Sequence, residues 1–426
     1  MRLRKNAADL TTAEKTDFVT ALKELKAKNV TAPDGSQINT YDQFVAIHLG
    51  VTRKLKNGQV LNFGAHNGAH GNAAFLPWHR EYLRRIELEL QNISNNADLT
   101  IPYWDWSNRE ATTDKIFVDS FMGGDATGPD VTNPFGFFGR KVITGPFAKA
   151  NGWPIDPRVH RWRLTNTLEF GDELIRNLSS VDELPTPEDI DSLFHSDKDD
   201  YEAFREALES DPRMHNDIHV WVGGSMLFMS SPSDPIFLLN HANIDRLWAL
   251  WQADGHGGAG FYPDTGEPEG HNQENPMWPW DGGNTGVTTV PEIQALIPSF
   301  TDEVRPVHVL DCRILDYGYV TWDRVKAILD GAIERWKERT GFQPDLSIHG
   351  NNFGWNTPEE LADSMAFGVR LIEPNKVANN RGHETNLVVA LKTGVPGFPR
   401  MPLGGPFASK AEIAEIAHWI DSGMPS

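Results

Sequence analysis

Residues 214–224, MHNDIHVWVGG, place His215 and His219 four positions apart. Side chains at positions i and i+4 of a helix project from the same face, so this pair could hold one metal ion. Zinc hydrolases use the spacing HExxH, but the second position here is Asn216, so the general base of such an enzyme is absent. Taken alone, the pair is explained more simply as two unrelated histidines on one amphipathic helix.

A third histidine downstream changes that balance. His241 lies in residues 234–248, DPIFLLNHANIDRLW, an apolar helical pattern that Asp234 can cap and Pro235 can open. If this helix packs against the first, three neutral imidazoles meet, a ligand set that suits copper as well as zinc. Asp245, one turn after His241, could fix neighbouring groups.

The same arrangement recurs upstream. His48 lies in the helical pattern of residues 41–50, His79 lies in that of residues 76–91, and His70 lies in the loop between them. Two sets of three histidines, each drawn from paired helices, can face each other across a four-helix bundle, where dinuclear metal centres are commonly built. The sequence therefore predicts a mainly α fold, with a dinuclear metal centre inside a four-helix bundle.

Helical patterns also lie toward both ends of the chain, and Thr11 with Glu14 forms a capping-box pattern before the first. The further helices expected cover residues 15–28, residues 324–341, a short stretch from Thr357, and a last stretch from Ser409 to Gly423. Because 426 residues exceed one ordinary domain, the helix over 324–341 is expected to join a large domain to a smaller one. Residues 107–165 and 254–290 are rich in Gly, Pro, Asn and Asp, which predicts long loops.

Charge and cysteine content exclude several functions. The chain has 59 acidic and 39 basic residues and a formal net charge of -20, a balance that repels nucleic acid and anionic membranes. Its only cysteine, Cys312, excludes an intrachain disulfide, a cysteine-rich zinc site and CxxCH haem attachment. No stretch has the apolar length of a membrane span, and residues 1–15 lack the apolar run of a signal peptide. We therefore expect a cytoplasmic protein, or one exported with a leader that this chain does not carry.

Three motifs together resemble the copper-binding signatures of the tyrosinase family, the type 3 copper oxidases. They are HGNAAFLPWHREYLRRIE at residues 70–87, HNDIHVWVGG at residues 215–224 and SPSDPIFLLNHANIDRLW at residues 231–248. The resemblance covers residues 1–322 and includes VITGPFA at residues 142–148 and the motif Tyr317-Gly318-Tyr319. It implies a helical bundle with long loops around two copper ions.

The resemblance also implies six copper ligands. His48, His70 and His79 match the ligands of the first copper, and His215, His219 and His241 match those of the second. His66 competes with His70, and the family's spacing before the FLPWH motif favours His70. Many members have two adjacent histidines where this chain has Asn240 and His241, and the second is the ligand. Cys312 is too distant in sequence for the thioether that some eukaryotic members form.

The chemistry implied is the oxidation of phenols by O2, with ortho-hydroxylation of monophenols and oxidation of o-diphenols to o-quinones. Attack on a monophenol requires loss of its proton, which is a general-base step. In tyrosinases that this chain resembles, the base is a water held by an Asn after the first ligand of the second copper and by an upstream Glu. Asn216 matches the Asn, Glu209 is the better match for the Glu, and Glu206 is the second choice.

Other residues near the pocket follow less directly from the resemblance. Met229 and Ser231 lie where the family places a residue beside the substrate, although a buried core methionine explains Met229 equally well. Phe75 and Trp78 are expected to pack the bundle. The same ligand set would serve a catechol oxidase, an o-aminophenol oxidase or an O2 carrier of haemocyanin type, and Asn216 favours hydroxylation. The partners expected are small phenols, with no nucleic acid and no membrane, while a copper-loading helper protein and the oligomeric state stay open.

The segment after the catalytic part resembles the end of a class I cytochrome c domain. Met401 lies where the axial methionine would be, and an amphipathic helix follows it. Asp345 and Ile348 replace the two attachment cysteines before His349, so no haem is expected.

Three parts of the chain are therefore expected. They are a dicopper catalytic domain over residues 1–322, a helical linker over residues 323–341 and a haem-less cytochrome c-like domain over residues 342–426. The last domain is expected to be either a lid over the copper pocket or a stabilising appendage. Two of its histidines, His383 and His418, are expected at the surface or within helices.

Overall fold

The computed structural model describes the chain except for residues 62–65, 134–135, 162–169, 181–182, 267–269 and 426. The α-helices are α1 (Thr12–Ala27), α2 (Thr40–Val51), α3 (Phe75–Ser94), α4 (Arg109–Ala111), α5 (Pro187–Ser192), α6 (Tyr201–Ser210), α7 (His215–Val222), α8 (Ile236–Trp251), α9 (Pro291–Gln294), α10 (Trp322–Thr340), α11 (Pro358–Asp363), α12 (Asn386–Lys392) and α13 (Lys410–Asp421). The strands are β1 (Arg2–Leu3), β2 (Asn29–Thr31), β3 (Gln37–Asn39), β4 (Leu55–Lys56), β5 (Gln59–Val60), β6 (Asp130–Asn133), β7 (Gly136–Lys141), β8 (Ile175–Arg176), β9 (Val287–Thr288), β10 (Tyr317–Gly318), β11 (Met365–Ala366) and β12 (Val369–Arg370). The described part of the fold is thus rich in helix, and its strands are short. None of its helices has the length and apolar character needed to cross a bilayer.

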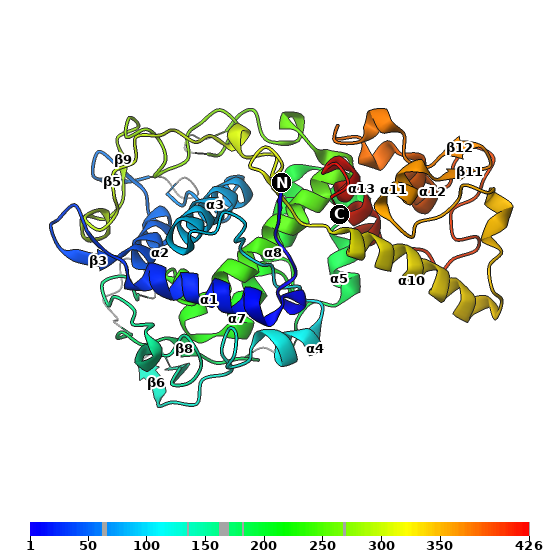
Figure 1. Cartoon of the computed structure of the whole chain (residues 1–426). Helices are drawn as coiled ribbons and strands as arrows, with labels where there is room; N and C mark the ends of the chain where they lie inside the picture. The colour runs from blue at the N-terminus through cyan, green and yellow to red at the C-terminus, as the bar shows by residue number, and fades with distance from the viewer. Residues whose placement is uncertain (62–65, 134–135, 162–169, 181–182, 267–269, 426) are drawn as a thin grey trace.

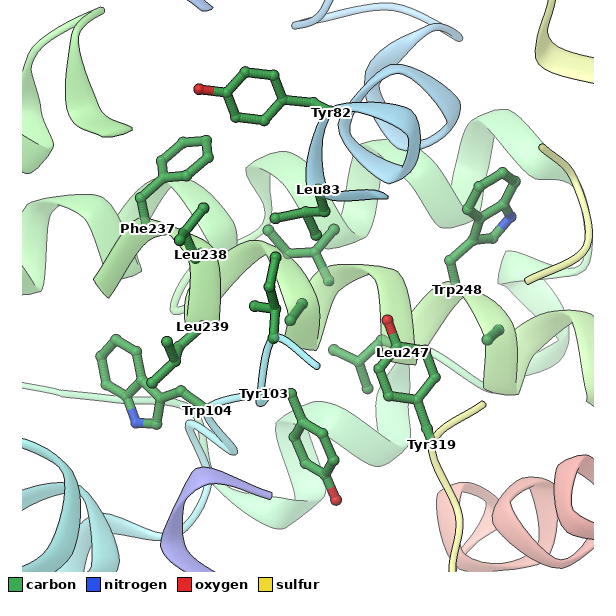
Figure 2. Packing of buried hydrophobic residues seen from close by; sticks show 14 of the residues in the cluster. Tyr82, Leu83, Tyr103, Trp104, Phe237, Leu238, Leu239, Leu247, Trp248 and Tyr319 are labelled. Atoms are coloured by element: carbon green, nitrogen blue, oxygen red, sulfur yellow. The ribbon is translucent and has the colours of Figure 1, made fainter. Parts of the chain in front are cut away.

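Helix α8 runs through the middle of the molecule, with α3 on one side of it and α7 on another (Figure 1). Every residue of α8 is buried, because its sequence is apolar on nearly all faces. Figure 2 shows α8 residues such as Phe237 and Trp248 packed among Tyr82 of α3 and Trp104 and Tyr319 of the surrounding loops. A helix that is apolar on nearly all faces therefore forms the centre of the core.

Three helices begin at the residues that the capping patterns predict, whereas α8 begins at Ile236 and has no side-chain cap. The Thr11 side chain accepts a hydrogen bond from the Glu14 amide, and the Glu14 carboxylate accepts one from the Thr11 amide. Ser409 caps α13 in the same reciprocal way, and Thr357 caps α11. The end of the last helix was predicted two residues too late, since α13 ends at Asp421.

Regular structure also interrupts both predicted loops, and residues 254–290 contain β9. Residues 107–165 contain α4 and the hairpin of β6 and β7, which β8 extends to a three-stranded antiparallel sheet. Near the N-terminus, β1 pairs in parallel with β10, so that Arg2 lies opposite Tyr317. The start of the chain is thereby held against the Tyr317-Gly318-Tyr319 motif.

The C-terminal segment packs on α10 and on the C-terminal end of α8 (Figure 1). Glu415 of α13 forms ion pairs with Arg246 of α8 and with Arg324 of α10. Lys392 pairs with Asp254, just beyond α8. His418 lies in α13 and is buried among these contacts, so it is a helix residue but not a surface one.

Candidate metal centre

The first histidine triad combines two helices and a loop. His48 comes from α2, His79 from α3 and His70 from the loop before α3, and their ligand atoms lie within 4.8 Å of one another. His66 lies outside this triad, and its backbone carbonyl accepts a hydrogen bond from the Lys54 amide. The geometry thus brings His70 to the site and leaves His66 in the loop.

The second triad comes from helices alone. His215 and His219 lie one turn apart on α7, His241 lies on α8, and their ligand atoms again lie within 4.8 Å of one another. The rings of His79 and His241 stack with centroids 4.2 Å apart and planes at 22°. The two triads therefore face each other across the core.

Five of the six histidines are oriented through Nδ1. The acceptors are Met229 O for His48 at 2.9 Å, Asn67 Oδ1 for His70 at 3.3 Å, Phe75 O for His79 at 2.8 Å, Asn216 Oδ1 for His215 at 3.0 Å and Met226 O for His219 at 2.8 Å. A carbonyl oxygen can only accept, so Nδ1 carries the proton in each ring. The lone pair is then on Nε2, the nitrogen that is left for a metal ion.

The remaining ring nitrogens fit a metal pair. His215 Nε2, His219 Nε2 and both nitrogens of His241 are buried without a hydrogen-bond partner among the described residues. The Nε2 atoms of His48 and His79 lie 3.5 Å apart, although neither carries a proton to share. Unpartnered buried nitrogens are costly, and two metal ions would satisfy them. Six neutral imidazoles without a thiolate or carboxylate suit copper.

Burial lowers the pKa of all six imidazoles, to about 3 for His48 and to about 4 for His219. For His70, His79 and His241, the neighbouring histidines lower the pKa further, because protonated rings would repel one another. The imidazoles are therefore neutral near pH 7, which is the state that binds a metal.

Aromatic rings enclose the triads. Phe237 stacks on His241 with centroids 4.0 Å apart, and Phe75 meets both His79 and His215 edge to face. Trp78 stacks on Tyr82, and its indole N–H donates to the Trp278 carbonyl. Phe75 and Trp78 pack the core, as the sequence predicts.

In the sequence, the predicted acid–base residues Glu209 and Asn216 lie before and after His215. Asn216 is exposed, and its side-chain oxygen accepts from His215 Nδ1. Glu209 is buried at the end of α6, where Oε1 accepts from the Gly71 amide at 2.7 Å and Oε2 from Arg205 at 2.9 Å. Burial raises the pKa of Glu209, while Gly71 and Arg205 lower it. Glu206 is exposed on the same helix, so the geometry favours Glu209 of the two.

Met229 and Ser231 both follow α7, in the connection to α8. The Met229 side chain is 36% exposed, so it is not a core methionine, and its backbone carbonyl orients His48. Ser231 is buried, and its amide donates to the Phe228 carbonyl.

Asp245 is buried in an ionic network instead of lying on an exposed helix face. It accepts hydrogen bonds from the guanidinium groups of Arg4 and Arg80 and from the hydroxyls of Tyr317 and Tyr319. Its recorded partners therefore tie the N-terminus and the Tyr317-Gly318-Tyr319 motif to α8 and include no triad histidine.

Sequence reasoning missed the groups that hold the ligands in place. Helix α6, which carries Glu209, was not predicted, although Tyr201, Phe204 and Leu208 follow helical spacing. The carbonyls of Phe75, Met226 and Met229 act through the backbone, so no side-chain type marks them.

Two facing triads of neutral imidazoles on a helical core define a protein with a dinuclear, histidine-only metal centre. The chain belongs to the tyrosinase family, because the family profile described as "Common central domain of tyrosinase" matches residues 38–254, which include all six histidines. The chain is accordingly a copper-dependent phenol oxidase with a dinuclear copper centre.

Similar proteins agree with this assignment. The chain is 32% identical over 315 residues to grixazone synthase of Streptomyces griseus subsp. griseus, covering 66% of this chain and 94% of the relative. It is 36% identical over 293 residues to tyrosinase of Streptomyces antibioticus, covering 66% of this chain and 93% of the relative. A polyphenol oxidase structure from Thermothelomyces thermophila, at 23% identity, covers 75% of this chain and 89% of its own with a TM-score of 0.51, which shows the shared fold.

Proposed function

We propose that this chain ortho-hydroxylates monophenols and oxidises the resulting o-diphenols to o-quinones. In this proposal His48, His70 and His79 bind one copper ion, and His215, His219 and His241 bind the other. The observation that carries it is the pair of facing triads, with unpartnered Nε2 atoms in the second, beside Asn216 and Glu209. When bound, the copper pair supplies two-electron chemistry with O2.

The protein's own part in hydroxylation is to take the phenol proton. Asn216 and Glu209 both lie against His215, since the Asn216 side chain and the Glu209 backbone oppose the lowering of the His215 pKa by burial. A water between these two residues would pass the phenol proton to Glu209, whose raised pKa suits a proton acceptor. The overall reaction balances as monophenol plus O2 giving o-quinone plus water.

The aromatic walls orient the substrate and exclude bulk water. Phe75 and Phe237 pack against the histidines, and Met229, whose carbonyl accepts from His48 Nδ1, has a partly exposed side chain. We propose that the phenol ring enters beside Met229, close to Asn216. Ser231 is buried, so its contribution would be to support this wall.

The test compares tyramine with dopamine, which differ by one hydroxyl. The copper-loaded protein is expected to form quinone from both, with one O2 consumed per quinone from tyramine and half an O2 per quinone from dopamine. Glu209→Gln keeps an oxygen that can accept from Gly71 but lowers basicity, so tyramine turnover should fall ~100-fold while dopamine turnover persists. Glu206→Gln is the matched control, because Glu206 is exposed on the same helix.

A second candidate, oxidation of catechols or o-aminophenols without hydroxylation, is favoured by one observation. Both oxygens of Glu209 and the side-chain oxygen of Asn216 already have partners, which suits purely structural roles. Equal losses of tyramine and dopamine turnover in Glu209→Gln, or no turnover of tyramine by the unaltered protein, would support this candidate.

We also propose that residues 1–322 form the catalytic domain, 323–341 a helical linker and 342–426 a haem-less cytochrome c-like domain. The ion pairs of the last segment with Arg246, Asp254 and Arg324 support a stabilising appendage over a lid. Deleting residues 342–426 should then lower Tm and leave KM for dopamine unchanged. A rise in kcat/KM on deletion would favour the lid.

A further inference from the structure

One loop touches both histidine triads. We call residues 224–233 the bridging loop, since they connect α7 to α8. Within it, the Met226 carbonyl accepts from His219 Nδ1 at 2.8 Å, and the Met229 carbonyl accepts from His48 Nδ1 at 2.9 Å. The two carbonyls are three residues apart, so a displacement of this loop would turn one ring in each triad.

A buried hydrogen-bond chain holds the start of the bridging loop. The Ile175 amide donates to Ser225 Oγ at 3.1 Å, Ser225 Oγ lies 3.0 Å from His160 Nε2, and His160 Nδ1 lies 2.9 Å from the Gly171 carbonyl. Because the carbonyl can only accept, Nδ1 carries the proton, and Nε2 therefore accepts from the Ser225 hydroxyl. One neutral tautomer of His160 satisfies every group in the chain.

The residue after His160 holds the other end of the same loop. Ser230 Oγ accepts from the Arg161 amide at 3.2 Å and donates to the Arg161 carbonyl at 2.9 Å. Residues 160–161 thus hold the loop at Ser225 and at Ser230, on either side of the two carbonyls that meet the triads.

The entrance to the loop leaves little room for movement. Gly224 has a φ of +53°, and a Cβ at this position would lie 2.1 Å from the Ile175 carbonyl oxygen. Only glycine fits so close to β8, which fixes Ser225 beside Ile175. His160 and Ser225 are both fully buried, and burial lowers the pKa of His160 to about 4.

We propose that His160 is a positioning residue that, through Ser225 and the bridging loop, sets the orientation of His219 and His48 and so couples the two copper sites. This inference rests on the ligand assignment of the proposed function. The ring nitrogens of His160 bond Gly171 and Ser225 and no triad histidine, so its effect passes through two backbone carbonyls.

The experiment measures copper release from the fully loaded protein to a coloured Cu(I) chelator under reducing conditions. His160→Phe and Ser225→Ala should each release both copper ions about 10- to 100-fold faster, as expected for loss of a group that orients a ligand. The kcat for dopamine should fall with KM within ~2-fold, and Tm of the copper-free protein should stay within a few degrees. The double variant should release copper no faster than the faster single variant, since both substitutions remove the hydrogen bond between His160 and Ser225.

Two further variants sharpen the test. His160→Gln offers an amide oxygen to the Ser225 hydroxyl. It should therefore release copper more slowly than His160→Phe, at a rate close to that of the unaltered protein. Ser364→Ala is the matched control, because Ser364 is a fully buried serine whose Oγ accepts a backbone N–H from Gly354 at 3.1 Å, far along the chain in the C-terminal segment. It should leave copper release unchanged.

The outcomes separate this inference from the function on which it rests. Release of one copper ion alone, or unchanged release with a lowered Tm, would overturn the coupling. An unaltered protein that binds fewer than two copper ions would instead contradict the ligand assignment itself.

Discussion

The two halves of α8 differ in whether their buried polar side chains have bonding partners. In the N-terminal half, Asn240 and His241 are fully buried, and both polar atoms of each side chain lack a partner among the described residues. In the C-terminal half, Asp245 and Arg246 are also buried, and each has partners of opposite charge. One half carries His241, the proposed metal ligand, and the other is anchored to the N-terminus and to α13.

This contrast separates function from stability along a single helix. An unpartnered buried polar group lowers folding stability by about 1 to 3 kcal/mol. A residue that carries one is therefore kept for function and not for stability. A buried charge is tolerated when its partners hold it, and removing one partner is then costly. We therefore expect replacement of His241 in the first half to change function at little cost in stability, and replacement of Asp245 in the second half to do the reverse.

The largest effect is expected for His241→Leu. This change removes one ligand, so copper content should fall from two ions per chain to one. Phenol oxidation should fall by more than about 100-fold, because even loss of an orienting partner costs 10- to 100-fold. The copper-free variant should be at least as stable as the copper-free parent, since an unsatisfied imidazole has been replaced by an apolar group. A variant that keeps two copper ions would remove His241 from the site.

Asp245→Asn should have the opposite signature. Arg4 and Arg80 would keep their buried positions with a neutral partner, at a cost of about 3 to 5 kcal/mol in the free energy of unfolding measured with urea. Asp316→Asn is the control, because Asp316 is 67% exposed beside Arg2 and should cost under ~1 kcal/mol. A large change in dopamine kcat with intact stability would instead place Asp245 in the copper site.

The sequence predicts the first half of α8 better than the second. His241 lies in a recognisable motif, and helical spacing brings it toward His215 and His219, so local patterns suffice to find the triad. The partners of Asp245 include Arg4, 241 residues away, and the partner of Arg246 is Glu415, 169 residues away. No local pattern encodes such pairs. The sequence therefore predicts Asp245 beside the metal centre, whereas the structure shows it in an ionic network with Arg4 and Arg80.

A similar limit applies around the first triad. The helices that carry His48 and His79 follow from apolar periodicity, whereas His70 follows from the spacing of the family that the chain resembles. The loop that carries His70 is held by groups from elsewhere, namely Glu209 on the Gly71 amide and the hydroxyls of Tyr201 and Tyr262 on the Ala73 carbonyl. Since these contacts join a loop backbone to distant side chains, the sequence does not reveal them.

The anchored half of α8 should also show a pH dependence through α13. Asp421, at the end of α13, is 5% exposed, and burial raises its pKa to about 6 despite its hydrogen bond from the Gly382 amide. Between about pH 4 and pH 6 the unfolded chain releases this proton while the folded chain keeps it, so Asp421 lowers stability as pH rises. Relative to the unaltered protein, Asp421→Asn should gain about 3 kcal/mol across this interval, measured by urea unfolding at each pH. A constant difference between the two proteins would show that Asp421 titrates alike in both states.

The smallest effect is expected for Asn240→Leu, which tests the contrast at its finest point. Asn240 is buried with neither amide atom partnered, whereas Asn243, one turn later, is also buried but accepts from Arg246 at 3.5 Å. Replacing Asn240 removes an unsatisfied amide and should raise the free energy of unfolding of the copper-free protein by ~1 kcal/mol, while Asn243→Leu should lower it. Copper content and KM for dopamine should not change in Asn240→Leu, because the neighbouring His241 is held by stacking on Phe237 and His79. If Asn240→Leu instead loses copper, the unpartnered amide serves the metal centre. Asn240 would then share the functional role of the neighbouring His241.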